Sequence, residues 1–159
     1  MADAQSGHEK TLTSLLPALA GANLIYGLGM LESGVTIDYG QLVMDAEFAR
    51  MIKFCVPGIP VSDETLSVDV IAEIGPFGDF LSHDATYRGM RGQSRSQLID
   101  RRVREEWTAA GSTSIYDRAL AAARAILETH EPQPLSDDVA AELRRIIVEA
   151  ERELGVGRG

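Results

Sequence analysis

Residues 21–34 read GANLIYGLGMLESG, and this stretch decides the predicted fold. Four glycines interrupt its apolar run, and a glycine inside a helix costs about 1 kcal/mol relative to alanine. The segment 22–31 is therefore predicted to be a strand. Its apolar residues are consecutive rather than alternating, which is typical of a parallel strand that is covered on both faces. The rest of the chain offers no parallel neighbour of comparable quality, which indicates an incomplete fold.

Helix signals flank this predicted strand. Ser6 and Glu9 have the spacing of a capping box, and Pro17 is expected to kink or shorten the helix that follows. Later helices are predicted to begin at polar caps and to end near glycine or proline. The predicted starts are Asp38, Ser62, Ser94, Ser114 and Ser136, with a long loop at 77–93. The fold class is therefore α/β, and the isolated chain is expected to be predominantly helical.

The composition bounds the partners and the compartment. A net charge of −9 over 159 residues argues against nucleic acid and against an anionic membrane, because both reward basic patches. The arginines of 101–104 are followed by Glu105 and Glu106, so they are expected to form a solvated helix face. The single cysteine, Cys55, excludes a disulfide within the chain and fits a reducing, cytoplasmic setting. Neither a signal peptide nor a membrane-spanning run is recognised.

No standard catalytic or cofactor motif is present. The sequence GLG at 27–29 lacks the third glycine and the helix start of a dinucleotide fingerprint. The three histidines, His8, His83 and His130, lie far apart in the sequence, so no metal site is predicted.

Tyr26 and Glu32 form the best local constellation. Parallel α/β folds build their sites at the carboxyl ends of strands, where glycines leave room for a ligand. An aromatic face and a negative charge suit a small cation such as a quaternary ammonium. A buried strand followed by an exposed glutamate fits the same residues. His83 and Tyr87 lie in the predicted loop, and long loops are often functional, although a histidine that holds the loop together fits equally.

Longer stretches of the sequence resemble the trimethylamine methyltransferase family. The resemblance covers nearly the whole chain. It runs through DAQSGHEKTLTSLLPALAGANLIYGLGMLESG (3–34), QLVMDAEFARMI (41–52), GPFGDFLSHDATYRGMR (75–91), DRRVREEW (100–107) and YDRALAAARAILETHEP (116–132). Members of this family move a methyl group from trimethylamine, or in some branches from a quaternary amine such as glycine betaine, to a corrinoid protein.

The resemblance implies a (β/α)8 barrel, which needs about 250 residues. The chain is therefore expected to be the C-terminal third of a longer protein, with residues 1–88 as the last βα units of a TIM barrel and 89–159 as a C-terminal helical extension. In the trimethylamine branch the catalytic residue is pyrrolysine, encoded by an amber codon, and its position is expected a few residues before Met1. If the amber codon is read as a stop, a chain that starts at the next methionine would begin as this one does. A deliberate truncation would give the same first residue.

The resemblance also implies the chemistry. A methylated amine is the expected substrate, and the corrinoid (cobalamin) is expected on a partner protein, so that this chain itself binds no cofactor. The candidate substrate-binding residues are Gln5, Tyr26, Glu32, His83 and Tyr87. The remainder of the barrel and further copies of the chain are expected partners, and the chain alone is expected to be inactive. A stand-alone helical interaction module and a glycine betaine methyltransferase relative are the alternatives.

Overall fold

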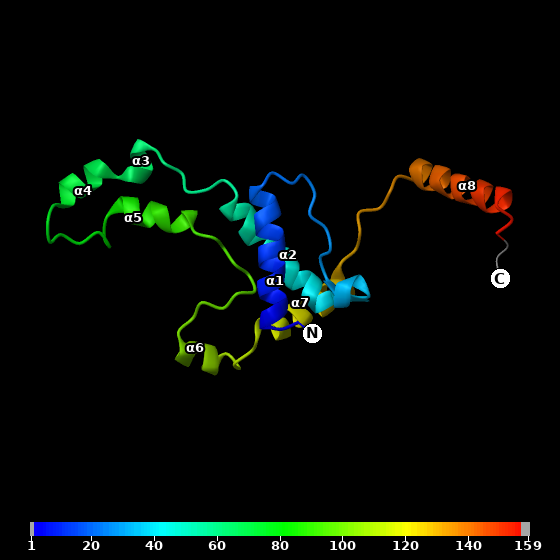
Figure 1. Cartoon of the computed structure of the whole chain (residues 1–159), viewed down its shortest axis with the longest axis horizontal. Coiled ribbons are helices and arrows are strands. Elements are labelled where there is room, and N and C mark those ends of the chain that lie inside the picture. Colours follow the sequence, from blue (N-terminus) through cyan, green and yellow to red (C-terminus); the bar gives the residue numbers. More distant parts are fainter. Residues whose placement is uncertain (1, 157–159) are drawn as a thin grey trace. The chain divides into compact units, whose positions relative to one another are not determined.

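The computed structural model describes residues 2–156, and helices make up most of them (Figure 1). Two compact units divide the chain, Met1–Leu127 and Glu128–Gly159. In chain order the elements are α1 (Ala4–Leu19), β1 (Met30–Leu31), η1 (Glu32–Gly34), β2 (Thr36–Ile37), α2 (Tyr39–Cys55), α3 (Asp63–Leu66), α4 (Val68–Ile74), α5 (Asp84–Gly89), η2 (Met90–Gly92), α6 (Arg104–Ala109), α7 (Ile115–Thr129) and α8 (Asp137–Glu153). The predominantly helical character predicted from the sequence is confirmed.

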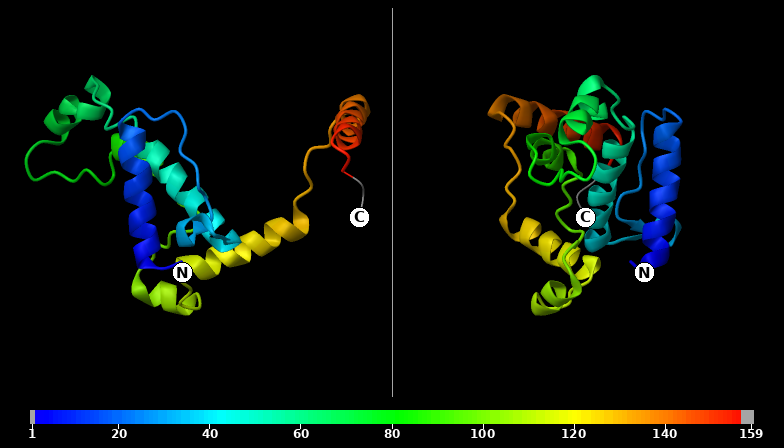
Figure 2. Two further views of the ribbon diagram at one scale, coloured as in Figure 1. Left: turned by 45° about the vertical axis from the view of Figure 1, so that its right-hand side comes forward. Right: turned by 90° about the vertical axis from the view of Figure 1, so that its left-hand side faces the viewer.

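Helices α1 and α2 lie side by side in the first unit (Figure 2). The cap of α1 is Asp3, three residues before the predicted cap, since its carboxylate accepts a hydrogen bond from the backbone N–H of Ser6 at 3.1 Å. It ends at Leu19, two residues after Pro17. The predicted start of α2 is confirmed, since Asp38 accepts from the backbone N–H of Gln41 at 2.7 Å. Side-chain caps of this kind satisfy amide groups that have no partner within the helix.

The predicted strand 22–31 is wrong for most of its length. Only Met30 and Leu31 are in a strand, and they pair antiparallel with Ile37 and Thr36. Residues 22–29 have an irregular backbone, in which Gly27 and Gly29 adopt positive φ values of 102° and 77°. A parallel strand is held by neighbours that come from elsewhere. Within residues 2–156 the one sheet is this two-stranded hairpin, so the predicted barrel stays a prediction.

This irregular segment is expected to make the chain self-associate. The side chains of Leu24 and Tyr26 are 81% and 85% exposed, and in the part of the chain that the structure describes no hydrogen bond reaches the backbone of residues 23–26. Exposed apolar groups and unpaired amides recruit partner chains. Sedimentation at tens of micromolar should show species larger than the monomer, and Leu24→Lys should shift them toward the monomer. A clean monomer with a cooperative melt would contradict this expectation, and Leu135→Lys is the matched control.

The core of the first unit is small and joins α2 to the start of α7. Met44, Leu98 and Ala119 are buried together, and Val43, Phe48, Ile115 and Tyr116 pack against them. The hydroxyl of Tyr116 donates to Asp38 at 2.8 Å, next to Gly40, where an added Cβ would lie 2.8 Å from the tyrosine ring. The backbone N–H of Gln41, together with this hydroxyl, holds the pKa of Asp38 below its usual value. The cap of α2 is therefore also the contact that places α7.

Glu47 ties a distant loop to α2. Its side chain is 1% exposed, and its Oε1 accepts hydrogen bonds from the Ser96 hydroxyl, from the backbone N–H of Gln97 at 2.7 Å and from that of Leu98 at 3.4 Å. Arg50 donates to its other oxygen. The helix predicted to begin at Ser94 is wrong, since residues 93–103 contain no helix, and Glu47 holds the amides of Gln97 and Leu98 in this irregular loop. The helix begins only at Arg104.

Acid is expected to weaken this loop attachment. Burial alone would raise the pKa of Glu47, but the hydrogen bonds from Ser96, Gln97 and Arg50 outweigh burial and hold that pKa below its ordinary value. A lowered folded-state pKa gives stability that is present above about pH 4.3 and is lost as the pH falls through the folded-state pKa. Thermal melts followed by circular dichroism between neutral pH and that range should therefore show a melting temperature that falls with acidification.

The Glu47→Gln variant identifies the group responsible for this acid dependence. Its melting temperature should fall less steeply in the same acid range, whereas the exposed-site control Glu105→Gln should keep the parent slope. Parallel acid profiles for the parent and Glu47→Gln would show that another group governs the loss.

Residues 57–93 contain three short α-helices and the 3-10 helix η2. The predicted cap at Ser62 is confirmed by a capping box with Thr65, but the helix breaks at Ser67, whose φ is 53°. The predicted loop 77–93 contains α5, which begins at Asp84 after its cap, His83. Many apolar side chains in this stretch are exposed. They include Ile59, Val61, Leu66, Val68, Ile71, Phe77 and Leu81.

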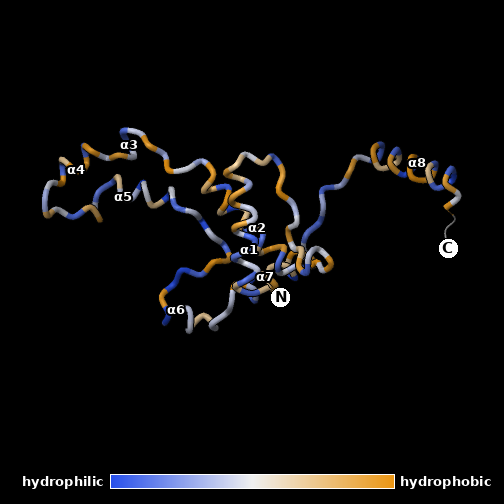
Figure 3. Tube along the Cα trace, in the orientation of Figure 1, coloured by the Kyte–Doolittle hydropathy of each residue, from blue (hydrophilic) through white to orange (hydrophobic). Residues whose placement is uncertain are grey.

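The second unit contains α8, an amphipathic helix. Its predicted start after Ser136 is confirmed. Hydrophobic and hydrophilic residues alternate along its turns (Figure 3), and one face carries Val139, Leu143, Ile146 and Ile147. No helix among residues 2–156 is long and apolar enough to cross a membrane. The compact units divide after Leu127 rather than after residue 88, so the predicted roles of 1–88 and 89–159 stay predictions.

Candidate functional site

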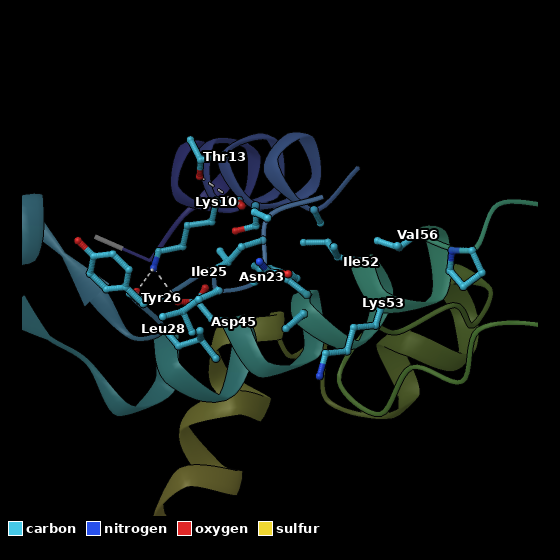
Figure 4. A pocket seen from close by; sticks show the side chains of 18 residues that line it. Lys10, Thr13, Asn23, Ile25, Tyr26, Leu28, Asp45, Ile52, Lys53 and Val56 are labelled. Carbon is cyan, nitrogen blue, oxygen red and sulfur yellow. Dashed lines mark hydrogen bonds and ion pairs between the residues drawn. The ribbon is translucent and has the colours of Figure 1, made fainter. Parts of the chain in front are cut away.

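A cavity of about 640 Å³ lies between α1, α2 and the irregular segment that joins them (Figure 4). Most of its wall is apolar, with Ile25 and Leu28 from the segment and Ile52 and Val56 from α2. Lys10 reaches into it from α1 toward Tyr26 and Asp45 (Figure 4). The cavity therefore combines an apolar surface with the charged cluster of Lys10 and Asp45 and with the side chain of Lys53.

Lys10 and Asp45 form the centre of this cluster. The Nζ of Lys10 lies 2.6 Å from Oδ2 of Asp45 and donates to the carbonyl oxygen of Gly27 at 3.3 Å. The same carboxylate oxygen accepts from the backbone N–H of Gly29 at 2.8 Å. Its other oxygen accepts from Nε2 of Gln41 at 2.6 Å. Asp45 is only 6% exposed, and three donors satisfy it, as buried carboxylates require.

This cluster fixes the turn at residues 27–29. Lys10 holds the carbonyl side of the turn, and Asp45 holds its amide side, from two different helices. Gly29 cannot be replaced easily, because an added Cβ would lie 2.9 Å from Cβ of Leu42 and its φ is positive. Since Lys10 already balances the charge of Asp45, that carboxylate is not available for a ligand cation.

The chain matches a family model over nearly its whole length. The model described as "Trimethylamine methyltransferase (MTTB)" matches residues 1–155. The chain belongs to the trimethylamine methyltransferase family. The resemblance seen in the sequence is thereby confirmed.

Two of the curated relatives of this trimethylamine methyltransferase family member are themselves named trimethylamine methyltransferase. The trimethylamine methyltransferase of Desulfitobacterium hafniense is 57% identical over 98% of this chain and 32% of its own length. A second one, from Methanosarcina mazei, is 43% identical over 98% of this chain and 31% of its own length. A glycine betaine methyltransferase from Desulfitobacterium hafniense is 28% identical. The chain thus spans about a third of the length of the curated relatives it matches.

The structure of this family member places the five predicted site residues in different surroundings. Tyr26 lines the cavity with an exposed ring. Glu32 lies outside the cavity wall, with a φ of 51°, and accepts from the hydroxyl of Thr36 at 2.9 Å. Gln5 is exposed on α1 and donates to Glu9 at 2.9 Å.

The two residues of the predicted loop lie on α5. His83 caps this helix, since its Nδ1 accepts from the backbone N–H of Ala85 at 3.0 Å. Tyr87 is exposed, and the guanidinium of Arg91 lies 5.2 Å from its ring centre. The structure therefore brings only Tyr26 to the cavity, and the substrate-binding roles of all five residues stay predictions.

The sequence analysis missed Lys10, Gln41 and Asp45. Gln41 and Asp45 are four residues apart on α2, a spacing that places two side chains on one helix face. Lys10 lies 35 residues before Asp45, and no local pattern links them. Among residues 2–156 no three histidine, cysteine, aspartate or glutamate side chains come together in a way that could hold a metal ion.

Proposed function

We propose that this chain is part of a trimethylamine methyltransferase that transfers a methyl group from trimethylamine to the Co(I) of a corrinoid held by a partner protein. The observation that carries the proposal is the family match over residues 1–155. Relatives named for trimethylamine are 57% and 43% identical to the chain, whereas the relative named for glycine betaine is 28% identical. This difference favours trimethylamine over glycine betaine as the substrate.

Tyr26 and Glu32 are the residues that we propose to face the methylated amine. The ring of Tyr26 is 85% exposed at the edge of the cavity, and an open aromatic face attracts a cationic methylammonium group. Glu32 follows on the same stretch and is exposed, and its carboxylate accepts a hydrogen bond from the Thr36 hydroxyl. The turn fixed by Lys10 and Asp45 sets the backbone between them. The chain would thus orient the amine and balance its charge.

The corrinoid, when bound to its partner, supplies the cobalt that accepts the methyl group. The substrate would be the protonated trimethylammonium ion: its methyl group would go to the corrinoid, the electron pair of the broken bond would stay on nitrogen, and neutral dimethylamine would leave. An apolar wall keeps water away from this step. The single cysteine fits the reducing setting of the cytoplasm.

We further propose that residues 22–31 become a barrel strand when the rest of such a protein is present. Support comes from the unpaired backbone of residues 23–26 and from the exposure of Leu24. A catalytic site at the mouth of such a barrel is built by loops from many strands. The chain alone is therefore expected to be inactive, and calorimetry should detect no sub-millimolar affinity for trimethylamine.

A chimera tests the proposed function. This chain would replace the matching third of the Desulfitobacterium hafniense trimethylamine methyltransferase, to which it is 57% identical. Methylation of a corrinoid protein, followed by its absorbance, should depend on trimethylamine and not on glycine betaine. A folded chimera that transfers no methyl group from trimethylamine, beside an active parent, would overturn the proposal.

Glu32→Gln in this chimera is expected to slow methyl transfer by roughly 30- to 150-fold, which is the range for losing one hydrogen bond or pair that involves a charged group. The substitution keeps the side-chain volume and removes one negative charge near the bound cation. Folding should be little changed, because Glu32 is exposed. The measurement is the rate of corrinoid methylation.

Glu128→Gln is the matched control for this prediction. Glu128 is an exposed glutamate near the end of α7, and it should leave the rate unchanged. Equal rates for the two variants would show that Glu32 is only an exposed acid in the turn after residue 31.

A further inference from the structure

The turn that carries Glu32 has an unusual backbone. Glu32, Ser33 and Gly34 follow one another with positive φ values of 51°, 54° and 88°. Residues with a side chain adopt this left-handed conformation rarely, whereas glycine adopts it freely. Strained residues of this kind persist where their surroundings hold them, and they are concentrated at functional sites. We call residues 32–34 the strained turn.

The side chain of Met30 packs against the strained turn. An added Cβ at Gly34 would lie 2.7 Å from Cε of Met30, and an added Cβ at Gly27 would lie 3.4 Å from its Sδ. The thioether of Met30 therefore lies beside both glycines. It joins the strained turn to the turn at residues 27–29, which two helices hold through hydrogen bonds. The strained turn thus packs on a part of the backbone that is itself fixed.

Thr36 orients the carboxylate of Glu32. Its hydroxyl donates to Oε2 of Glu32 at 2.9 Å from strand β2, where Thr36 pairs with Leu31. A bond to one oxygen of a carboxylate limits rotation of the group and leaves the other oxygen open. In the part of the chain that the structure describes, 2–156, no lysine, arginine or histidine pairs with Glu32. The hydroxyl therefore orients this carboxylate without balancing its charge, whereas Lys10 balances the charge of Asp45.

We propose that Thr36 is a positioning residue for methyl transfer, which holds Oε2 of Glu32 so that Oε1 faces the trimethylammonium ion. This role rests on the proposed function, in which Glu32 faces the methylated amine. The open oxygen would accept the single N–H of that ion, and the strained turn would keep this acceptor in one place. A carboxylate that is already oriented loses less rotational freedom when the cation binds, which favours binding.

Steady-state kinetics of the chimera described above test this role. Thr36→Val removes the hydroxyl, keeps the branched shape and suits a strand. It should lower kcat/KM for trimethylamine by roughly 3- to 10-fold, the range for one intramolecular hydrogen bond. Most of this loss should appear as a higher KM, because the bound amine needs the oriented carboxylate before and during the reaction. Thr36→Ser restores a hydroxyl and should stay within about twofold of the parent.

The order of these two variants distinguishes positioning from a structural role. Valine suits a strand better than serine, so a purely structural role would make Thr36→Val both the more stable and the more active variant. Positioning predicts the reverse order for activity, with Thr36→Ser above Thr36→Val. Circular dichroism melts of both variants in the full chain give the order of stability.

Two further variants identify the group through which Thr36 acts. When Glu32→Gln is already present, adding Thr36→Val should change the rate by less than about twofold, because no charged carboxylate remains to be oriented. The matched control is Thr108→Val on α6, which removes an exposed hydroxyl that donates to the carbonyl oxygen of Arg104 at 2.8 Å. This control should keep the kcat/KM of the parent.

Three results would overturn the positioning role. Parent kinetics in Thr36→Val beside a slow Glu32→Gln would remove this role and leave the proposed function in place. Equal losses in Thr36→Val and Thr36→Ser, or a full additional loss in the double variant, would assign Thr36 to the structure of the hairpin alone. A folded parent chimera that transfers no methyl group would overturn the proposed function, and the role of Thr36 with it.

Discussion

Replacing Asp45 with alanine is expected to destabilise the folded chain by about 3–5 kcal/mol, which is the cost of removing one partner of a buried ion pair. Asp45 is 6% exposed and accepts from Lys10, Gly29 and Gln41. The substitution removes this acceptor from two neutral donors and leaves the ammonium group of Lys10 with the carbonyl oxygen of Gly27 alone. Urea denaturation followed by circular dichroism measures the loss.

A double-mutant cycle isolates the ion pair. Lys10→Met removes the charge that Asp45 balances, so the double variant should recover part of the stability lost by Asp45→Ala. The control is Lys53→Ala, at an exposed position of α2, the helix that carries Asp45. Its free energy of unfolding should stay within about 0.5 kcal/mol of the parent value. A loss below about 1 kcal/mol for Asp45→Ala would mean that the cluster contributes little to the free energy of unfolding.

Glu47→Gln is expected to cost about 3 kcal/mol, which reflects the penalty for leaving buried donors unsatisfied. The carboxylate binds one hydroxyl and two backbone amides of residues 96–98. An amide that turns its NH2 group toward these donors repels them, and one that turns its oxygen toward them loses the charge. The loop should therefore detach from α2, which hydrogen exchange of the Gln97 and Leu98 amides would report directly.

The exposed-site control for this second prediction is Glu105→Gln on α6, which should leave both the stability and the exchange of these amides unchanged. Slow exchange at Gln97 and Leu98 in Glu47→Gln would show that packing of Leu98 in the core holds the loop without the carboxylate.

Local signals predicted the helix starts well. Asp38, Ser62 and Ser114 each cap a helix at the predicted position, because a side-chain cap depends only on residues of the same helical turn. The strand 22–31 could not be predicted in the same way, since a strand forms only beside a neighbour, and among the described residues only Met30 and Leu31 of this stretch have one. The helix predicted from Ser94 does not form, and these residues are instead held in a loop by Glu47, which lies 50 residues before Gln97 in the sequence.

The candidate site was harder to predict than the fold. Tyr26 could be predicted to lie at the site, because an aromatic residue among several glycines is a local sequence pattern. The ion pair between Lys10 and Asp45 joins two helices across the irregular segment, so only the three-dimensional arrangement reveals it. His83 and Tyr87 are predicted from their position in a loop, and Gln5 is predicted from the family resemblance alone. These criteria do not show which side chains share a cavity.

The irregular segment has a consequence for handling the protein. Proteases bind their substrates in an extended form with free backbone groups, and residues 23–26 offer that form together with the exposed side chains of Leu24 and Tyr26. Cleavage there would separate α1 from the rest of the chain covalently. The ion pair between Lys10 and Asp45 would still join the two pieces, so a nicked sample would run as one species under native conditions and as two under denaturing ones.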